Sequence, residues 1–212
     1  RFKNSITYNN ITNCLTSDDE NNIYYGTEGG DLNKIDSTGV VTKIFEVQNS
    51  EKTTIYPIKS LYRDKNLLWI GVMKNGIKIY DLKSKKEIKN HFSFQLRRHL
   101  KEVSVLDIKK GSGNTIWIAT IGRGLIKYDT KNKKMKTFNS RQLKSSYVKI
   151  IHPDKKNLIV VGSDNLSFFK SKKKGVFKIS NYPSVEDSSR LNIVSVYKDS
   201  RGLIWVGTRT RG

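Results

Sequence analysis

A short motif recurs five times along the 212-residue chain. It reads "IYYGT", "LWIGV", "IWIAT", "IVVGS" and "IWVGT". Aligned on the small residue, the copies lie at Gly26, Gly71, Ala119, Gly162 and Gly207, in steps of 45, 48, 43 and 45 residues. Self-similarity at such a period indicates a repeat architecture in which each unit packs on its neighbours.

Each repeat contains four short apolar runs separated by turn residues. In the second unit the first three are "IKSLYRD", "LLWIGV" and "IKIYD", and a fourth such as "KMKTF" closes the third unit. Runs of four to seven residues with β-branched and aromatic side chains, bounded by Asp, Asn, Lys and Gly, are typical of strands. Only "FSFQLRRHLKEVSVL" suggests a helical turn or two.

The second run of each unit is apolar on both of its faces. Leu68, Ile70 and Val72 point to one side of a strand, and Trp69 and Gly71 point to the other. A strand of this kind is covered on both faces. We therefore predict an all-β fold, a β-propeller of four-stranded antiparallel blades.

The aromatic and small residues of the motif have a packing role in this fold. A missing or minimal side chain beside the indole leaves room for the ring and for close approach of the next sheet. The residues assigned to this structural repeat are Trp69, Gly71, Trp117, Ala119, Gly162, Trp205 and Gly207. Gly76 and Gly124 fall where the second strand turns into the third, a position that favours positive φ.

The repeats divide the whole chain into blades of one propeller domain. We predict the last strand of a preceding blade at 1–8, blades at 9–50, 51–94, 95–139 and 140–181, and the first half of a further blade at 182–212. Four blades and a half would leave strand edges exposed. We therefore expect a fragment that packs against the remaining blades of a longer protein.

The chain is strongly basic, with 40 Lys and Arg against 19 Asp and Glu and a net charge of +21. This excess favours polyanionic partners, but solvated lysines in turns such as "DLKSKKE" explain much of it equally well.

No apolar run approaches the roughly 18 residues of a membrane span, and the first residues lack a secretion signal. One cysteine, Cys14, leaves the compartment open.

Loops at one edge of the blades carry the candidate binding residues. In an antiparallel meander, the turns between second and third strands and the segments between blades fall on the same edge, and longer loops there are typical binding sites. The candidates are Lys74, Arg97, Arg98, Arg123, Arg141, Arg190, Arg209 and Arg211. The rings of Tyr56, Phe92, Phe94 and Tyr182 would stack on sugars, and arginine suits carboxylate and sulfate. A solvated basic rim without a ligand remains an equal alternative.

Catalytic chemistry has little support in the sequence. The three histidines, His91, His99 and His152, lie in different units without metal-ligand spacing. Asp64, Asp154 and Asp199 recur with the repeat and are expected to cap turns and not to act as paired acids. We assign no catalytic residue, no metal and no cofactor.

The segments "SLYRDKNLLWIGVMKNGIKIYD" and "SVYKDSRGLIWVGTRTRG" resemble the two-component regulator propeller repeats of bacterial hybrid two-component sensor histidine kinases, best known from Bacteroidetes. Tyr24 stands where Trp is usual, and the fourth unit lacks both the Trp and the second Gly. The resemblance implies a periplasmic propeller in a homodimeric parent anchored in the inner membrane. It also implies that the parent senses oligosaccharides from polysaccharide breakdown and signals to transcription.

Two other functions stay open on the sequence alone. One is a polysaccharide lyase on a propeller scaffold, which would need acid and base residues converging on the central channel. The other is a module that binds proteins or polyanions through the +21 charge. Nucleic acid is the less favoured polyanion for this domain.

Overall fold

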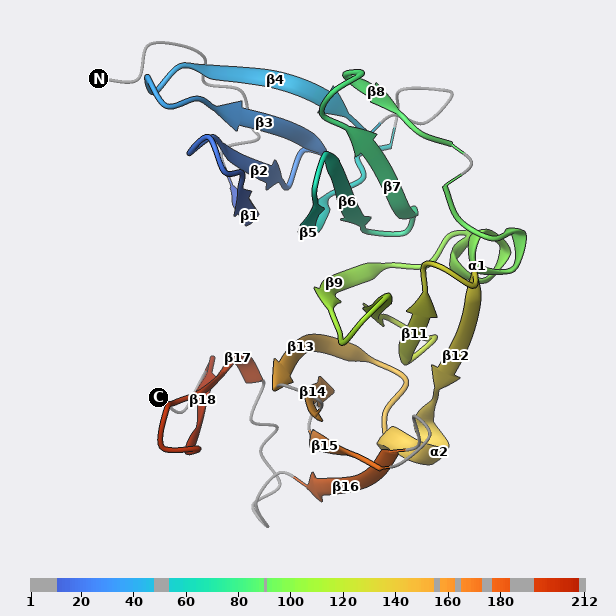
Figure 1. Cartoon of the computed structure of the whole chain (residues 1–212). Helices are drawn as coiled ribbons and strands as arrows, with labels where there is room; N and C mark the ends of the chain where they lie inside the picture. The colour runs from blue at the N-terminus through green and yellow to red at the C-terminus, as the bar shows by residue number, and fades with distance from the viewer. Residues whose placement is uncertain are drawn as a thin grey trace. The chain divides into compact units, whose positions relative to one another are not determined.

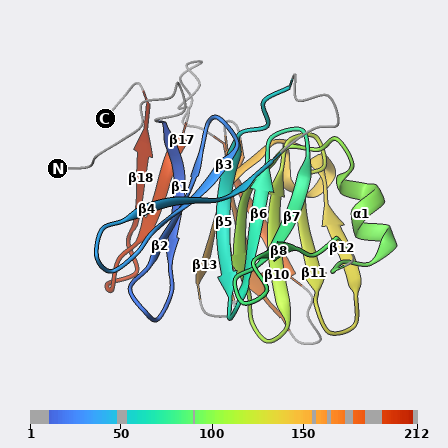
Figure 2. The same cartoon turned by 90° about the horizontal axis from the view of Figure 1, so that it is seen from above.

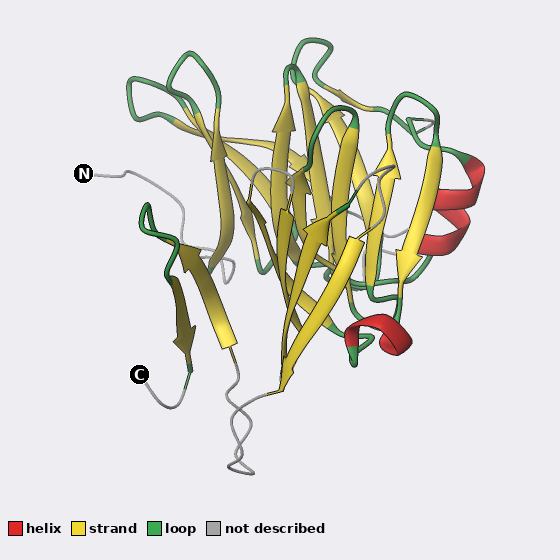
Figure 3. Cartoon of the chain, turned by 60° about the horizontal axis from the view of Figure 1, so that its bottom comes forward, coloured by secondary structure: helices red, strands yellow, loops and turns green. Residues whose placement is uncertain are grey.

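The computed structural model describes residues 11–47, 54–89, 91–154, 157–162, 165–172, 177–183 and 193–209. The predicted strand at 1–8 therefore lies outside the described residues. The chain forms two compact units, Arg1–Val105 and Leu106–Gly212, which are described one at a time. Strands dominate both units, and the described residues include two short helices (Figure 3).

The first unit contains two four-stranded antiparallel sheets, ordered β1-β2-β3-β4 and β5-β6-β7-β8 (Figure 1). Within the second sheet, β5, β6 and β7 run side by side (Figure 2). The strands are β1 Thr12–Ser17, β2 Ile23–Thr27, β3 Asp31–Ile35, β4 Val41–Glu46, β5 Ile58–Asp64, β6 Leu67–Val72, β7 Gly76–Asp81 and β8 Lys86–Glu87. Helix α1, Phe94–Leu100, follows the second sheet.

The second unit contains two more four-stranded antiparallel sheets and a two-stranded sheet, β17-β18. Its elements are β9 Val105–Lys110, β10 Thr115–Thr120, β11 Leu125–Asp129, β12 Lys134–Phe138, α2 Ser140–Leu143, β13 Val148–Asp154, β14 Asn157–Gly162, β15 Asn165–Ser171, β16 Phe177–Pro183, β17 Ile193–Lys198 and β18 Ile204–Thr208. Every sheet is a meander of consecutive strands. The predicted arrangement of four four-stranded blades and half of a fifth is confirmed.

The two faces of β6 are both buried, because sheets in a propeller are covered on both sides. Leu68, Ile70 and Val72 join a core cluster with Tyr24 and Leu32 of the preceding sheet. Trp69, which points to the opposite face, is 1 % exposed. The alternating apolar pattern of this strand therefore reflects two separate packing layers.

The small residue of the motif lies where the next sheet comes closest. A Cβ atom on Gly26 would lie 2.8 Å from Ile58 Cβ. Ile58 belongs to the first strand of the following sheet of the same unit. Glycine at this position therefore permits the close approach of the two neighbouring sheets.

A β-bulge recurs opposite the small residue. The pairing register shifts in β1, β5, β13 and β17, each time near the glycine of the second strand. In β5 the shift falls between Ile58 and Ser60, and Ser60 pairs with Gly71. A bulge bends its strand and increases the local twist, so these four sheets bend at an equivalent place.

An aromatic cluster fills the core of the second unit. Trp117 packs edge-on against Phe169 and Phe177, with ring centroids 6.1 and 5.6 Å apart, and against Phe138 at 6.0 Å. Trp205, the equivalent residue of the two-stranded sheet, is 57 % exposed. No third or fourth strand of that sheet lies within the described residues, so nothing described there covers the Trp205 ring in the way that Phe138 and Phe177 cover Trp117.

One helix agrees with the sequence and the other was not predicted. Helix α1 lies within the segment expected to form a helical turn, and the Ser93 hydroxyl caps it by accepting a hydrogen bond from Leu96 N at 3.2 Å. Helix α2 has a capping box, in which the Asn139 side chain accepts from Arg141 N while the Gln142 side chain accepts from Asn139 N. The spacing "NSRQ" carries this capping signal, which the strand-based interpretation overlooked.

Candidate functional site

Turns and interblade segments meet at one edge of the blades, as the strand parity predicts. In the first unit, the β6–β7 turn is tied to the segment after α1, because Gly76 N donates to Val103 O at 2.8 Å and Lys74 N donates to Ser104 Oγ at 3.0 Å. Met73 N donates to Pro57 O at 2.9 Å, which ties the same turn to the segment before β5.

The second unit repeats this arrangement with different residues. Gly122 N and Gly124 N in the β10–β11 turn both donate to Ser146 O, at 2.9 and 3.0 Å. The Asn165 side chain, which follows the β14–β15 turn, donates to the carbonyl of Leu143 in α2. The described segments after β8 and after β12 are thus both fastened by hydrogen bonds to a neighbouring turn.

A groove of about 570 Å³ opens on this edge of the first unit. Helix α1, strand β7, the β6–β7 turn and the chain after β8 form its walls. Two half-buried rings, Tyr56 and Phe92, and the buried side chains of Ile79 and Leu100 supply an apolar surface. We name this site the α1 groove. Its remaining lining includes the basic residues Lys74, Lys78, Lys89, Arg97 and Lys101 and the acidic residues Glu87 and Glu102.

Helix α1 is fixed against the β6–β7 turn by a close backbone approach. A Cβ atom on Gly76 would lie 2.7 Å from the carbonyl oxygen of Leu100, and Gly76 has φ +67°. Only glycine satisfies both constraints without strain. The inner face of the helix is anchored by Leu96 and Leu100, which are buried, so Arg97 is carried on a helix that cannot shift freely.

Trp69 packs against Phe92, one of the two rings that line the groove. Its ring meets Phe92 at 5.1 Å and His91 at 5.4 Å, both edge-on. The buried Trp69 Nε1 has no hydrogen-bond partner among the described residues. The packing of Trp69 therefore rests on ring contacts, and these contacts position the Phe92 ring at the groove.

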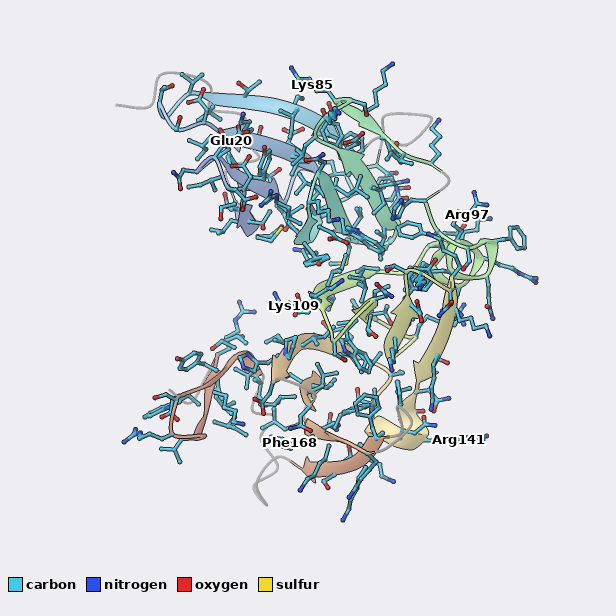
Figure 4. All side chains as sticks on the ribbon, viewed as in Figure 1. Glu20, Lys85, Arg97, Lys109, Arg141 and Phe168 are labelled. Carbon is cyan, nitrogen blue, oxygen red and sulfur yellow. The ribbon has the colours of Figure 1, made fainter. Side chains whose placement is uncertain are left out.

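The structure places two of the candidate binding residues together and separates the others. Lys74 and Arg97 line the α1 groove. Arg97 lies on α1 (Figure 4). Arg98 follows it on the same helix and is exposed, but it does not line the groove. The exposed side chains of Arg123, Arg141 and Arg209 lie in the second unit. Arg190 and Arg211 lie outside the described residues.

The aromatic candidates divide in the same way. Tyr56 and Phe92 line the groove, whereas Phe94 is 72 % exposed and does not line it. The side chain of Tyr182 is outside what the structure describes. Sequence reasoning missed Lys78 and Lys89, because a lysine on a strand or beside a turn looks like an ordinary solvated side chain.

One carboxyl group in the second unit is unusually buried. Asp107 accepts a hydrogen bond from Ile151 N at 2.9 Å, and its oxygen lies 3.3 Å from Lys109 Nζ. Burial raises the pKa of Asp107, although Lys109 and the backbone donors oppose the shift. Asp107 links β9 to β13 of the next sheet, so its role here is structural. Among the described residues, no group of three or more His, Cys, Asp or Glu side chains is placed to hold a metal ion.

Comparisons with known proteins agree with this architecture. The family model for the two component regulator propeller matches residues 188–210. Histidine kinase P4 of Formosa agariphila is 27 % identical over 124 residues, which is 58 % of this chain and 9 % of that protein.

Two solved structures from B. thetaiotaomicron share the fold. The extracellular domain of BT4673, assigned as a hybrid two component system, has a TM-score of 0.75 at 21 % identity over 95 % of this chain. The extracellular domain of BT3049, assigned likewise, has a TM-score of 0.72 at 22 % identity over 94 % of the chain. The chain spans 26 % and 28 % of those two structures.

These similarities establish the β-propeller fold. In the described residues, no helix is long and apolar enough to cross a membrane. The family match at 188–210, the similarity to a histidine kinase and the shared fold together confirm the resemblance to the two-component regulator propeller repeats of bacterial hybrid two-component sensors.

Proposed function

We propose that this chain is part of the ligand-sensing, extracytoplasmic propeller of a hybrid two-component sensor histidine kinase, and that it binds an oligosaccharide in the α1 groove. The propeller repeat and the similarity to extracellular sensor domains support the first part. The second part is carried by one observation: Tyr56, Phe92 and an apolar floor share a groove with basic side chains.

The groove has the properties of a site that binds without reacting. Aromatic rings offer flat apolar surfaces to the C–H face of a sugar, while charged and amide groups at the rim suit its hydroxyls. The walls are joined by the hydrogen bonds of Gly76 and Lys74, so little ordering is required when a ligand binds. Little of the binding free energy is therefore lost to ordering the site.

The remaining steps of the proposal concern the parent protein. Ligand binding to the propeller would change the arrangement of a homodimer anchored in the inner membrane, and the kinase would pass the signal to a DNA-binding regulator. A ligand shifts such an equilibrium only when it binds one state more tightly than the other. The sensing region would accordingly lie in the periplasm.

A glycan microarray followed by calorimetric titration of the chain tests the proposal. We expect a subset of oligosaccharides to bind, and we expect Phe92→Ala to weaken binding while Phe94→Ala, a change at an exposed ring on the same segment, leaves it unchanged. Circular dichroism establishes that both variants fold. Silence of the whole array, or equal loss in both variants, contradicts the assignment.

A further inference from the structure

We infer that the α1 groove selects oligosaccharides that carry an anionic group, either a sulfate ester or a uronate carboxylate, and that Arg97 and Lys74 determine this selectivity. The inference rests on the proposed function, since it names the class of ligand for the same groove. Its support comes from the charge balance, the anchoring of the two residues and the apolar floor.

The groove has an excess of positive charge. Five basic residues line it, against the acidic residues Glu87 and Glu102. Glu102 is engaged with Lys101 at 3.7 Å, and both side chains are about four-fifths exposed, so this ion pair is weak. Lys74, Lys78 and Lys89 form no ion pair with any described residue. The charges of these three lysines are therefore available for a ligand to neutralise.

Arg97 supplies a geometry that matches oxyanions. A guanidinium group is planar and presents parallel N–H donors, which fit two oxygens of a carboxylate or a sulfate at once. Helix α1 is held in place by buried Leu96 and Leu100. Arg97 is thus presented from a fixed backbone, which favours selection among ligands over general attraction.

Lys74 is anchored on the β6–β7 turn, which forms another part of the groove wall. It has φ +53°, a left-handed conformation that is costly for lysine, and its N–H donates to Ser104 Oγ at 3.0 Å. Ser104 is 8 % exposed, so this hydrogen bond is shielded from water. A strained residue held by a buried hydrogen bond at a groove rim is often found at ligand sites.

The apolar surface restricts the anion to one carried on a larger molecule. Ile79 and Leu100 are 1 % and 4 % exposed, so the accessible apolar surface comes mainly from the half-buried rings of Tyr56 and Phe92. A bare inorganic anion would leave these rings uncovered. The volume of about 570 Å³ lies within the range of roughly 300–1,000 Å³ typical of small-molecule sites. An anionic sugar meets both the charge and the surface.

Calorimetric titration of the chain with three sets of oligosaccharides of equal length tests this selectivity. The sets are neutral, uronate-containing and sulfated, with inorganic sulfate as a separate probe. We expect one or both anionic sets to bind at least about tenfold more tightly than the neutral set, since a charged hydrogen bond contributes on that order. We also expect the affinity to fall as NaCl is raised.

Variants of α1 provide the matched control. Arg97→Gln should weaken anionic binding about 10- to 100-fold and leave neutral binding unchanged, whereas Arg98→Gln should change neither. Asparagine tolerates the left-handed backbone at position 74. Lys74→Asn should therefore also weaken the binding of anionic oligosaccharides.

The possible outcomes separate the inference from the proposed function. Equal binding of neutral and anionic sugars overturns the inference and leaves the proposed function standing. Binding of inorganic sulfate as tightly as a sulfated sugar overturns the role of the apolar floor. Equal losses for Arg97→Gln and Arg98→Gln overturn the assignment of the groove. No binding by any oligosaccharide removes the proposed function itself.

Discussion

Trp205 donates its indole N–H to the carboxylate of Asp199, six residues earlier, over 3.2 Å. Tyr24 makes the equivalent contact, with its hydroxyl donating to Asp18 over 2.8 Å. Each aspartate also accepts backbone N–H groups in the turn between the first and second strands. In the second sheet the spacing between the aspartate and the ring is one residue shorter, because Asp64 lies five residues before Trp69. The turn aspartate and the ring of the second strand therefore act as one structural unit where the spacing allows it.

Removal of one turn aspartate should destabilise its sheet in a pH-dependent way. Burial works against the shift, but hydrogen bonds from Asn22, Tyr24 and Glu20 lower the pKa of Asp18 overall. Because the folded pKa lies below the unfolded value, the stabilisation is present above the unfolded value and is lost as the pH falls through the folded one. Asp18→Ala should cost about 1–2 kcal/mol in urea unfolding at pH 7 and much less near pH 2.

The neighbouring residue is the control for this experiment. Asp19 is exposed and pairs with Arg63, at 2.8 Å. Asp19→Ala should therefore have a much smaller effect at pH 7. Equal losses for the two variants would show that the turn hydrogen bonds do not stabilise the sheet.

Asp107 should show the opposite pH dependence. Burial raises the pKa of its carboxyl group, so its contribution to stability is full below the unfolded pKa and is lost as the pH rises through the folded value. Asp107→Asn keeps an acceptor for Ile151 N without the buried charge. The melting temperature of this variant should rise relative to the parent chain between pH 4 and pH 7. A variant that loses more stability at pH 7 than at pH 4 would show instead that the Lys109 ion pair dominates.

The buried Trp117 and the exposed Trp205 should contribute differently to the free energy of unfolding. Trp117 is 4 % exposed and contacts three phenylalanine rings, whereas Trp205 is 57 % exposed. Trp117→Ala should lower the free energy of unfolding by about 3–5 kcal/mol. Trp205→Ala should lower it by less than about 1.5 kcal/mol, mainly through the lost hydrogen bond to Asp199. Urea unfolding measures both, and similar losses would contradict the packing described for Trp117.

Gly76 should be more sensitive to substitution than another glycine with a similar backbone. Gly76 and Gly113 have φ values of +67° and +60°, but only a Cβ on Gly76 would meet a nearby atom, the Leu100 carbonyl oxygen. Gly113→Ala should cost about 1–2 kcal/mol from backbone strain alone. Gly76→Ala should cost more and should also weaken oligosaccharide binding, because α1 must move away from the turn. Equal stability losses and intact binding would show that this approach does not shape the groove.

The repeating sheets were predictable because each depends on local patterns. Leu68 and Trp69 point to opposite faces of their strand, which implies a strand buried on both faces. The glycine near the ring implies that a neighbouring sheet approaches closely. Helix α2 was missed because its signal is a four-residue capping box inside a segment interpreted as a loop. The exposure of Trp205 was not predictable either, because its motif is the same as that of Trp117 and only the surrounding strands differ.

The sequence predicts which edge of the blades carries the candidate site, but not which side chains line it. Strand parity placed Lys74 and the α1 segment together, and the hydrogen bonds of Gly76 and Lys74 agree with that placement. The choice between Arg97 and Arg98 depends on the rotation of a seven-residue helix about its axis. Lys78 and Lys89 join the groove through tertiary packing, which no local pattern records.

Methyl NMR of the chain with a sulfated oligosaccharide tests the account most directly. Ile77, Ile79 and Ile88 line the α1 groove, while Ile151 and Ile159 are buried in the second unit. We predict chemical-shift changes that saturate with ligand for the three groove isoleucines and no change for the other two. Changes centred on Ile151 and Ile159, or no change at any isoleucine at saturating ligand, would contradict binding in the groove.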